Sequence, residues 1–252
     1  MKPRTVLVTG GAQGIGLGIA GCFARQGYRV ALADMKADAA QEAAQKLADE
    51  TAPDALGIGC DITDRAQVDR AVAQVLQAWG HLDVLVNNAG ISPFVDIMEM
   101  PPELFNKVID VNLTGAFHCT QAAARHMLER GAGGRVIFIS SLAPKFSQPS
   151  QAEYSASKAG VEGLMRGFAT ALGRHGITCN AIAPGMILTP LTAHYWTQPG
   201  PAEQIKQLVP VGRIGAPEDI GNACVLLAAP EAAYINGVVL PVDGGFSVLI
   251  KG

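Results

Sequence analysis

Positive charge is not in excess in this sequence. The 252 residues hold 19 Lys and Arg against 22 Asp and Glu, which gives a formal net charge of −3. Proteins that bind nucleic acid through its phosphates carry a clustered basic face. This charge balance therefore argues against nucleic acid as a partner.

A long apolar run is also missing. The longest segment without Asp, Glu, Lys or Arg covers residues 176–202, and it contains Pro184, Pro190, Pro199 and Pro201. Prolines at this density break a membrane-spanning helix. The apolar run near the first residue is too short for a signal peptide. We therefore expect a cytoplasmic protein that does not enter a membrane.

Closely spaced cysteines are the third absence. The five cysteines form no CxxC pair and stand far apart, at Cys22, Cys60, Cys119, Cys179 and Cys224. Such spacing fits neither a disulfide framework nor a zinc site. We interpret them as small buried hydrophobic residues in a reducing compartment, and we expect no metal ion.

Apolar residues, in contrast, are plentiful, and they fall into two kinds of segment. Short runs rich in β-branched residues indicate strands at residues 5–9, 29–33, 56–60, 84–87, 135–140, 178–182 and 238–242. Longer amphipathic stretches indicate helices at residues 15–25, 37–49, 65–79, 102–127, 155–174 and 217–228. This alternation predicts an α/β fold, a doubly wound, seven-stranded parallel sheet with helices on both faces.

The same pattern predicts one domain over residues 1–252. The one long irregular connection lies at about residues 186–215, between a strand and the next helix. Connections of that length in compact domains usually have a function. We interpret this one as a lid over a substrate.

A glycine-rich turn follows the first predicted strand. Gly10, Gly14 and Gly16 stand in the segment TGGAQGIG, directly before the first helix. Glycine lets the backbone approach a pyrophosphate closely, and the start of the helix offers free N–H groups and a positive dipole. A glycine cluster alone is also compatible with an ordinary strand-to-helix turn.

One carboxylate makes a dinucleotide the better interpretation of that turn. Asp34 ends the second predicted strand, 18 residues after Gly16. A carboxylate at this place accepts hydrogen bonds from the ribose hydroxyls of adenosine and repels a 2′-phosphate. Ala12 and Gln13 add no cation there, so the sequence favours NAD over NADP. The alternative is a solvated residue at the end of a strand.

A tyrosine and a lysine are spaced for acid–base chemistry. Tyr154 and Lys158 are four apart at the start of a predicted helix, and therefore share one helical face. An ammonium nearby favours the phenolate and so lowers the tyrosine pKa toward the working pH. Ser141 ends a buried strand, where its hydroxyl can bond a substrate oxygen, while Ser140 is expected to point the opposite way. By itself, the Tyr–Lys spacing is also compatible with a surface pair.

An asparagine stands where a helix former is expected. Asn112 lies inside the predicted helix over residues 102–127, although Asn is unfavourable in helix interiors. Its presence indicates that its side chain or its carbonyl has a specific task.

Together these segments resemble the short-chain dehydrogenase/reductase family along nearly the whole chain. The sequence carries TGGAQGIG, Asp61-Ile62, NNAG at residues 87–90, Asn112, Ser141, YSASK at residues 154–158 and Pro184-Gly185 with Thr189, in the family's order. Ser141 and Tyr154 are 13 residues apart, the family's usual separation. The resemblance implies an enzyme that transfers a hydride between NAD and a secondary alcohol or ketone.

The resemblance also implies roles for individual residues. Tyr154 would be the general acid and base, and Ser141 would hold the reacting oxygen. Lys158 would lower the tyrosine pKa and bind the nicotinamide ribose, and Asn112 would position a water for proton relay. The implied cofactor-binding residues are Gly10, Gln13, Gly14, Ile15, Gly16, Asp34, Asp61, Ile62, Asn88, Ala89, Gly90, Val111, Tyr154, Lys158, Pro184, Gly185, Ile187 and Thr189.

The substrate side is less specific in the sequence. Residues expected by position to face the substrate are Ser92, Ala143, Lys145, Gln151, Met186, His194 and Trp196. Their polar members favour a sugar or a polyol, although solvated loop residues would look the same. A 3-oxoacyl-thioester reductase is the alternative enzyme, which Asp34 disfavours. A non-catalytic dinucleotide sensor is an alternative of another class.

Small residues suggest that the chain pairs with itself. The predicted helix over residues 155–174 carries Ala156, Ala159, Gly160, Gly163 and Gly167, which allow close helix contact. Members of the family that the sequence resembles pair through this helix, so we expect a homodimer or homotetramer. The alternative is that these residues pack against the chain's own sheet.

Overall fold

A parallel sheet forms the centre of the molecule in the computed structural model, which describes residues 3–51, 54–190, 192–193, 200, 203 and 207–249. The sheet has seven strands in the order β3-β2-β1-β4-β5-β6-β7. The strands are β1 (Thr5–Thr9), β2 (Arg29–Asp34), β3 (Ala55–Gly59), β4 (Val84–Asn87), β5 (Gly134–Ile139), β6 (Ile177–Pro184) and β7 (Val239–Val242).

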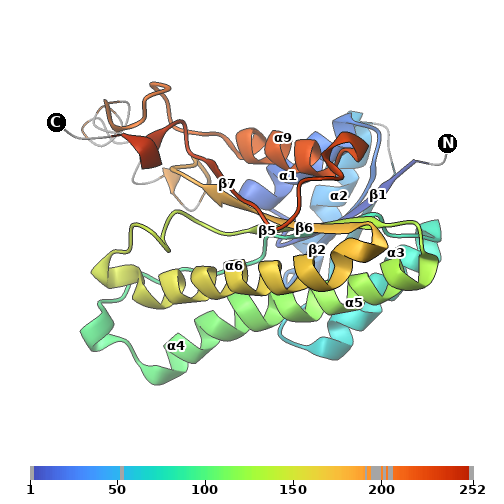
Figure 1. Cartoon of the computed structure of the whole chain (residues 1–252), viewed down its shortest axis with the longest axis horizontal. Coiled ribbons are helices and arrows are strands. Elements are labelled where there is room, and N and C mark those ends of the chain that lie inside the picture. The colour runs from blue at the N-terminus through green and yellow to red at the C-terminus, as the bar shows by residue number, and fades with distance from the viewer. Residues whose placement is uncertain are drawn as a thin grey trace.

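Helices cover both faces of this sheet (Figure 1). One face carries α1 (Gly14–Arg25), α2 (Ala37–Thr51) and α9 (Pro217–Ala228). The other face carries α3 (Arg65–Trp79), α4 (Pro102–Ile109), α5 (Gly115–Arg130) and α6 (Ala152–Leu172). The predicted doubly wound architecture is therefore confirmed.

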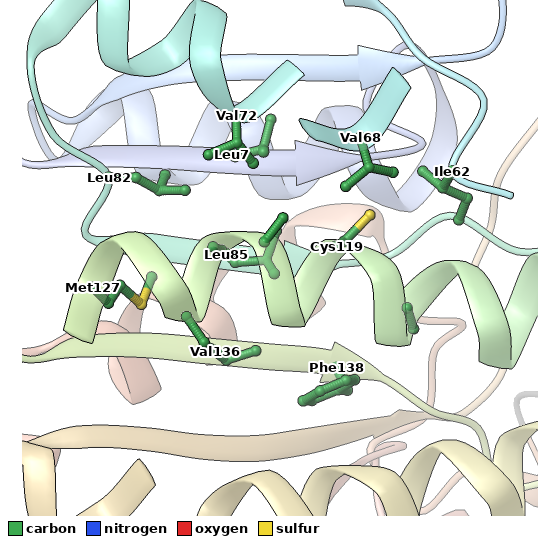
Figure 2. Packing of buried hydrophobic residues seen from close by; sticks show 14 of the residues in the cluster. Leu7, Ile62, Val68, Val72, Leu82, Leu85, Cys119, Met127, Val136 and Phe138 are labelled. Atoms are coloured by element: carbon green, nitrogen blue, oxygen red, sulfur yellow. The ribbon is translucent and has the colours of Figure 1, made fainter. Parts of the chain in front are cut away.

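The central strands are apolar because both of their faces are covered. Every residue of β1, β4, β5 and β6 is buried. Figure 2 shows the core on the α3, α5 and α6 side, where Leu85, Val136 and Phe138 of the sheet face Cys119 and Met127 of α5. Each large side chain fully buried in this way contributes roughly 1.5–3 kcal/mol.

The topology determines where a ligand can bind. From β1 the chain moves outward to β2 and β3, whereas from β4 it moves the other way, to β5, β6 and β7. In open α/β sheets, ligands bind beyond the carboxyl ends of the strands at such a reversal. Here that point lies between β1 and β4.

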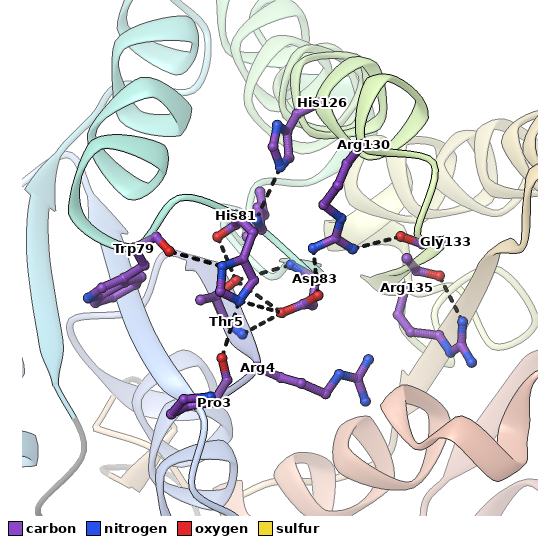
Figure 3. A network of polar contacts seen from close by, with 12 residues as sticks. Pro3, Arg4, Thr5, Trp79, His81, Asp83, His126, Arg130, Gly133 and Arg135 are labelled. Atoms are coloured by element: carbon purple, nitrogen blue, oxygen red, sulfur yellow. Dashed lines mark hydrogen bonds and ion pairs between the residues drawn. The ribbon is translucent and has the colours of Figure 1, made fainter. Parts of the chain in front are cut away.

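The opposite edge of the sheet, where the strands begin, is held by a polar network (Figure 3). Asp83 accepts a hydrogen bond of 2.8 Å from the Thr5 N–H and forms an ion pair of 2.7 Å with Arg130. The Leu82 N–H donates to Nε2 of His126 over 3.3 Å. This network joins the starts of β1 and β4 to the end of α5.

The main error of the sequence-based element predictions is at residues 102–127. Instead of one uniform helix, α4 is followed by a π-helical segment, Asp110–Thr114, and then by α5. The Gly115 N–H reaches back to the carbonyl of Asp110, which is the longer π-type bond. Insertions of this kind often occur at functional sites, and this one contains Asn112.

Other differences concern ends of elements. Helix α6 begins at Ala152 rather than residue 155, so Tyr154 lies inside its first turn. Strand β6 extends to Pro184, past the predicted end at residue 182. Among the described residues, no helix is both long and apolar enough to cross a lipid bilayer.

Candidate active site

The glycine turn after β1 is shaped by close backbone contacts. Gly10 and Gly14 have φ angles of +61° and +55°, which favour glycine. A Cβ on Gly16 would lie 2.1 Å from the Gly10 carbonyl oxygen, and one on Gly10 would lie 2.8 Å from Cα of Ala89. Gln13, at the N-cap of α1, makes no side-chain capping bond. The first N–H groups of α1 are thus left for an anion, as a pyrophosphate requires.

Hydrogen bonds from the residues directly after β4 hold this turn in place. Nδ2 of Asn88 donates to the carbonyls of Thr9 and Gly10 over 2.9 and 3.0 Å. The hydroxyl oxygen of Thr9 accepts the N–H groups of Asn88 and Ala89, each at 3.1 Å. The Asn88 side chain, predicted to line the adenosine ribose, is therefore committed to the turn itself. Sequence reasoning did not single out Thr9 for this bracing role.

Asp34 lies beside the same turn. Its carboxylate accepts the Ala12 N–H at 3.3 Å and the Lys36 N–H at 3.1 Å. No ion pair within the described residues involves it, so lone pairs remain for hydroxyl groups. The neighbouring Met35 is 73% exposed and brings no charge. A carboxylate without a cationic partner among the described residues therefore lies beside the glycine turn.

Asp61 and Ile62 border the site after β3. Asp61 accepts bonds of 2.9 and 2.8 Å from the N–H and hydroxyl of Thr63 through one carboxylate oxygen. Ile62 is buried against the start of α5, since a Cβ on Gly115 would lie 2.6 Å from its side chain. Among the remaining predicted cofactor residues, Ile15 packs against the hydrophobic core on the α1, α2 and α9 face of the sheet, and Val111 packs against the core on the other face.

Tyr154 and Ser141 meet at the carboxyl end of β5. Ser141 lies two residues beyond the end of that strand, and hydrogen bonding from its side chain acts to lower the pKa of Tyr154. The Ser141 oxygen in turn accepts the Ala143 N–H at 3.1 Å. Ser140 points elsewhere and donates to Glu162 over 3.0 Å, which agrees with the expected alternation along the strand.

Lys158 lies one turn beyond Tyr154 on the same face of α6. Its Nζ donates to the carbonyl of Ile139 over 2.8 Å and lies 5.6 Å from the centre of the Tyr154 ring. Burial lowers the pKa of Lys158 from 10.5 to about 8. A Cβ on Gly90 would lie 3.4 Å from this nitrogen and 3.1 Å from Oδ1 of Asn112, so these three residues converge.

The pKa of Tyr154 differs from the prediction. Burial raises it, and the opposing influence is the hydrogen bond from Ser141. The reason is that phenol and amine share a dry interior, which favours the neutral form of each. The ammonium of Lys158, predicted to lower this pKa, bonds the backbone of β5 instead.

Asn112 uses its whole amide group in hydrogen bonds. Oδ1 accepts the Ile91 N–H at 2.8 Å, and Nδ2 donates to the Ile91 carbonyl at 2.9 Å and to Oγ of Ser157 at 3.0 Å. The side chain is only 1% exposed. This bonding explains an asparagine in the middle of a helix. Ser157 was missed by the sequence reasoning, although it stands within YSASK.

The segment after β6 returns to the glycine turn. A Cβ on Gly14 would lie 3.7 Å from Cβ of Thr189, which brings these two predicted cofactor residues together. Gly185 is pressed against Asp243, with 2.7 Å between its Cβ position and Cα of Asp243. Ile187 forms a bridge with Gly215. Pro184 is the last residue of β6.

The predicted substrate residues are only partly brought together. Nε2 of Gln151 donates to Oγ of Ser92 over 3.1 Å, which joins the start of α6 to the loop after β4. Met186 lines a cavity of about 130 Å³ with Val209 and Arg213. Lys145 is exposed and Ala143 is buried. The predicted residues His194 and Trp196 lie outside the described residues.

The chain is similar to known proteins over nearly its full length. The family described as enoyl-(acyl carrier protein) reductase matches residues 10–247. The L-rhamnose 1-dehydrogenase (NAD(P)(+)) of Azotobacter vinelandii is 41% identical, over 98% of both chains. The 3-oxoacyl-(acyl-carrier-protein) reductase MabA of Mycobacterium tuberculosis is 41% identical, over 97% of this chain and 93% of that protein. The sorbitol dehydrogenase of Cereibacter sphaeroides is 38% identical, over 96% of both.

A solved structure gives the same result for the fold. The crystal structure of gox2181 superimposes with a TM-score of 0.92 at 35% identity, over 99% of this chain and 97% of that one.

Proposed function

Because the chain belongs to the short-chain dehydrogenase/reductase family, whose members are oxidoreductases, we propose that it oxidises a hydroxyl group of a sugar or polyol with NAD. The observation that carries this proposal is the position of Lys158 one helical turn from Tyr154, with Nζ 5.6 Å from the centre of the tyrosine ring and the Ser141 side chain beside the phenol. Relatives named for L-rhamnose and sorbitol support the substrate class.

The proposed chemistry divides between cofactor and protein. A bound NAD would supply the acceptor for the hydride that leaves the carbon carrying the hydroxyl. Tyr154 removes the proton from that hydroxyl, and Ser141 donates a hydrogen bond to the same oxygen. The pKa of about 8 keeps Lys158 cationic at neutral pH, and we propose that in the working complex this charge offsets part of the burial that raises the pKa of Tyr154. Asn112 fixes the backbone next to Lys158 through its bonds to Ile91.

The proposed preference for NAD rests on Asp34. A 2′-phosphate on the adenosine ribose would bring its negative charge against this carboxylate, whereas a diol would donate to it. The rhamnose-oxidising relative is named for both NAD and NADP, so preference here means a ratio rather than exclusion. Lys36, an exposed cation two residues further on, would lessen the repulsion.

The substrate pocket is proposed on the side of Ser92 and Gln151. Their mutual hydrogen bond places an amide and a hydroxyl together at the beginning of α6. Groups of this kind can exchange bonds with sugar hydroxyls at little cost, because each both donates and accepts. We propose Lys145, Ala143 and Met186 as further pocket residues, and the connection at about residues 186–215 as the lid.

The experiment is a substrate panel with the purified protein. Reduction of NAD at 340 nm is measured with aldoses, polyols and steroid alcohols, and oxidation of NADPH is measured with acetoacetyl-coenzyme A. Turnover of an aldose or polyol with NAD is expected. Preferential reduction of the thioester would instead support the 3-oxoacyl reductase function, which the identity to MabA favours. Dinucleotide binding without any turnover would indicate a sensor.

We also propose that the chain forms a cytoplasmic homodimer or homotetramer. Gly160 packs against its own chain, with 2.9 Å between its Cβ position and Leu113. Around the Cβ positions of Gly163 and Gly167, in contrast, no described atom outside their own stretch of the helix lies within 4 Å. Phe117 of α5, whose ring centre lies 6.2 Å from that of Phe168 in α6, is 37% exposed. These features leave room for α5 and α6 of a second copy of the chain. Sedimentation velocity would measure the state of assembly directly.

A further inference from the structure

Ser157 is a buried hydroxyl that joins three parts of the site. It lies in α6 between Tyr154 and Lys158 and is 0% exposed. Its Oγ accepts a hydrogen bond from Nδ2 of Asn112 at 3.0 Å and donates to the carbonyl of Tyr154 at 2.7 Å. A bonded chain thus runs from Asn112 through Ser157 to the backbone of the turn that carries Tyr154.

The hydrogen-bond partners of Asn112 fix the orientation of its side-chain amide. The amide group has two hydrogens, and their acceptors are the carbonyl of Ile91 and the hydroxyl of Ser157. Its oxygen accepts the Ile91 N–H. The amide therefore has one orientation that satisfies all its partners, and the Ser157 oxygen is required for it.

These hydrogen bonds connect the loop after β4 with the helical turn that carries Tyr154 and Lys158. At one end, Ile91 follows Gly90, whose Cβ position lies 3.1 Å from Oδ1 of Asn112 and 3.4 Å from Nζ of Lys158. At the other end, the Tyr154 carbonyl belongs to the turn between Tyr154 and Lys158. Displacement of this turn relative to residues 88–91 would misplace the phenol against a bound nicotinamide.

We propose that Ser157 is a positioning residue, which acts through Asn112 to hold the Tyr154–Lys158 turn at its working distance from the loop after β4. The proposal rests on the proposed roles of Tyr154 and Lys158 but not on the sugar substrate. A serine that bonds a carbonyl one turn earlier is common in helices and affects only local structure. The acceptor role toward Asn112 distinguishes Ser157 from that ordinary case.

The test compares two substitutions of Ser157 with a matched control. Ser157→Ala removes the hydroxyl and leaves one Asn112 N–H without a partner, whereas Ser157→Thr retains the hydroxyl. Ser155→Ala is the control, because Ser155 is also buried in α6 and its hydroxyl bonds Ser147 at 2.8 Å. The dissociation constant of NADH is measured by nicotinamide fluorescence, turnover by the substrate panel, and folding by thermal denaturation.

Ser157→Ala is expected to weaken NADH binding or lower turnover about tenfold, because an unsatisfied buried donor forces Asn112 to move. Ser157→Thr is expected to stay within a factor of two to three of the parent, and Ser155→Ala is expected to retain the parent's NADH affinity. If Ser157→Ala does not fold, Ser157→Cys, nearly equal in size and weak in hydrogen bonding, takes its place.

Three results would overturn the proposal. The first is a Ser157→Ala protein that melts earlier but binds NADH and turns over like the parent. The second is an equal loss in Ser157→Ala and Ser157→Thr. The third is an equal loss in Ser155→Ala. The NADH measurement requires no substrate, so failure of the substrate proposal is seen separately, as a parent that binds NADH but oxidises no sugar.

Discussion

Lys158 should cost the protein stability at neutral pH, and this cost can be measured. Its ammonium group is buried, and burial lowers its pKa from 10.5 to about 8. A shift of that size corresponds to about 3 kcal/mol in favour of the unfolded state wherever both states hold the proton. The bond from Nζ to the Ile139 carbonyl returns about 1 kcal/mol.

The sign follows from proton binding. Between pH 8 and pH 10.5 the unfolded chain keeps its proton on this lysine while the folded chain has lost it, so stability rises with pH across this window. Below pH 8 both states are protonated and the full cost is present. Lys158→Met should therefore be about 2 kcal/mol more stable than the parent at pH 7, although inactive.

The assay is thermal unfolding of parent and variant followed by circular dichroism. At about 2–4 °C per kcal/mol for a domain of this size, Lys158→Met should melt about 4–8 °C higher at pH 7. The gap should close as the pH is raised to 10. The ionisation of cysteines and of the tyrosines remote from residue 158 affects both proteins equally and cancels in the difference. A lower melting temperature for the variant at pH 7, or a gap that does not change with pH, would refute the reasoning.

Other substitutions test separate parts of the site. Tyr154→Phe should reduce turnover at least a thousandfold yet bind NADH like the parent, since only the proton-transferring hydroxyl is lost; an active variant would rule out Tyr154 as the base. Asp34→Ala with Met35→Arg should raise the ratio of NADP to NAD activity at least tenfold, because a repelling charge is replaced by an attracting one; an unchanged ratio would contradict the ribose role. Glu153→Met should raise the free energy of unfolding, measured by urea denaturation, by about 1 kcal/mol, because the fully buried carboxyl group has no hydrogen-bond partner among the described residues; a lower free energy of unfolding would reveal a missing partner.

The fold could be predicted from the sequence because its strands are covered on both sides. Runs such as residues 5–9 and 84–87 are mostly apolar and are buried at every position, and this is the pattern of a parallel sheet. The π-helical segment at residues 110–114 could not be predicted in the same way. It depends on the bonds of Asn112 to Ile91 and Ser157, which are distant in sequence.

The site shows the same division between local and distant causes. Spacing alone brought Tyr154 and Lys158 onto one face of α6, as predicted. The electrostatic relation between them was not accessible, because burial depends on β5 and the loop after β4 rather than on the helix. The bracing role of Asn88 and Thr9 was hidden for a similar reason, since Asn88 lies next to Thr9 and the glycine turn only after β1 and β4 pair.

The polar network at the starting edge of the sheet has a consequence for altering this protein. Asp83, Arg130 and Thr5 tie the strand beginnings together at the end remote from the reacting groups. Loops at the catalytic end can therefore be exchanged to suit other alcohols, while the starting ends of the strands in this open sheet stay fixed. Directed evolution should accordingly tolerate insertions there and reject changes around Asp83.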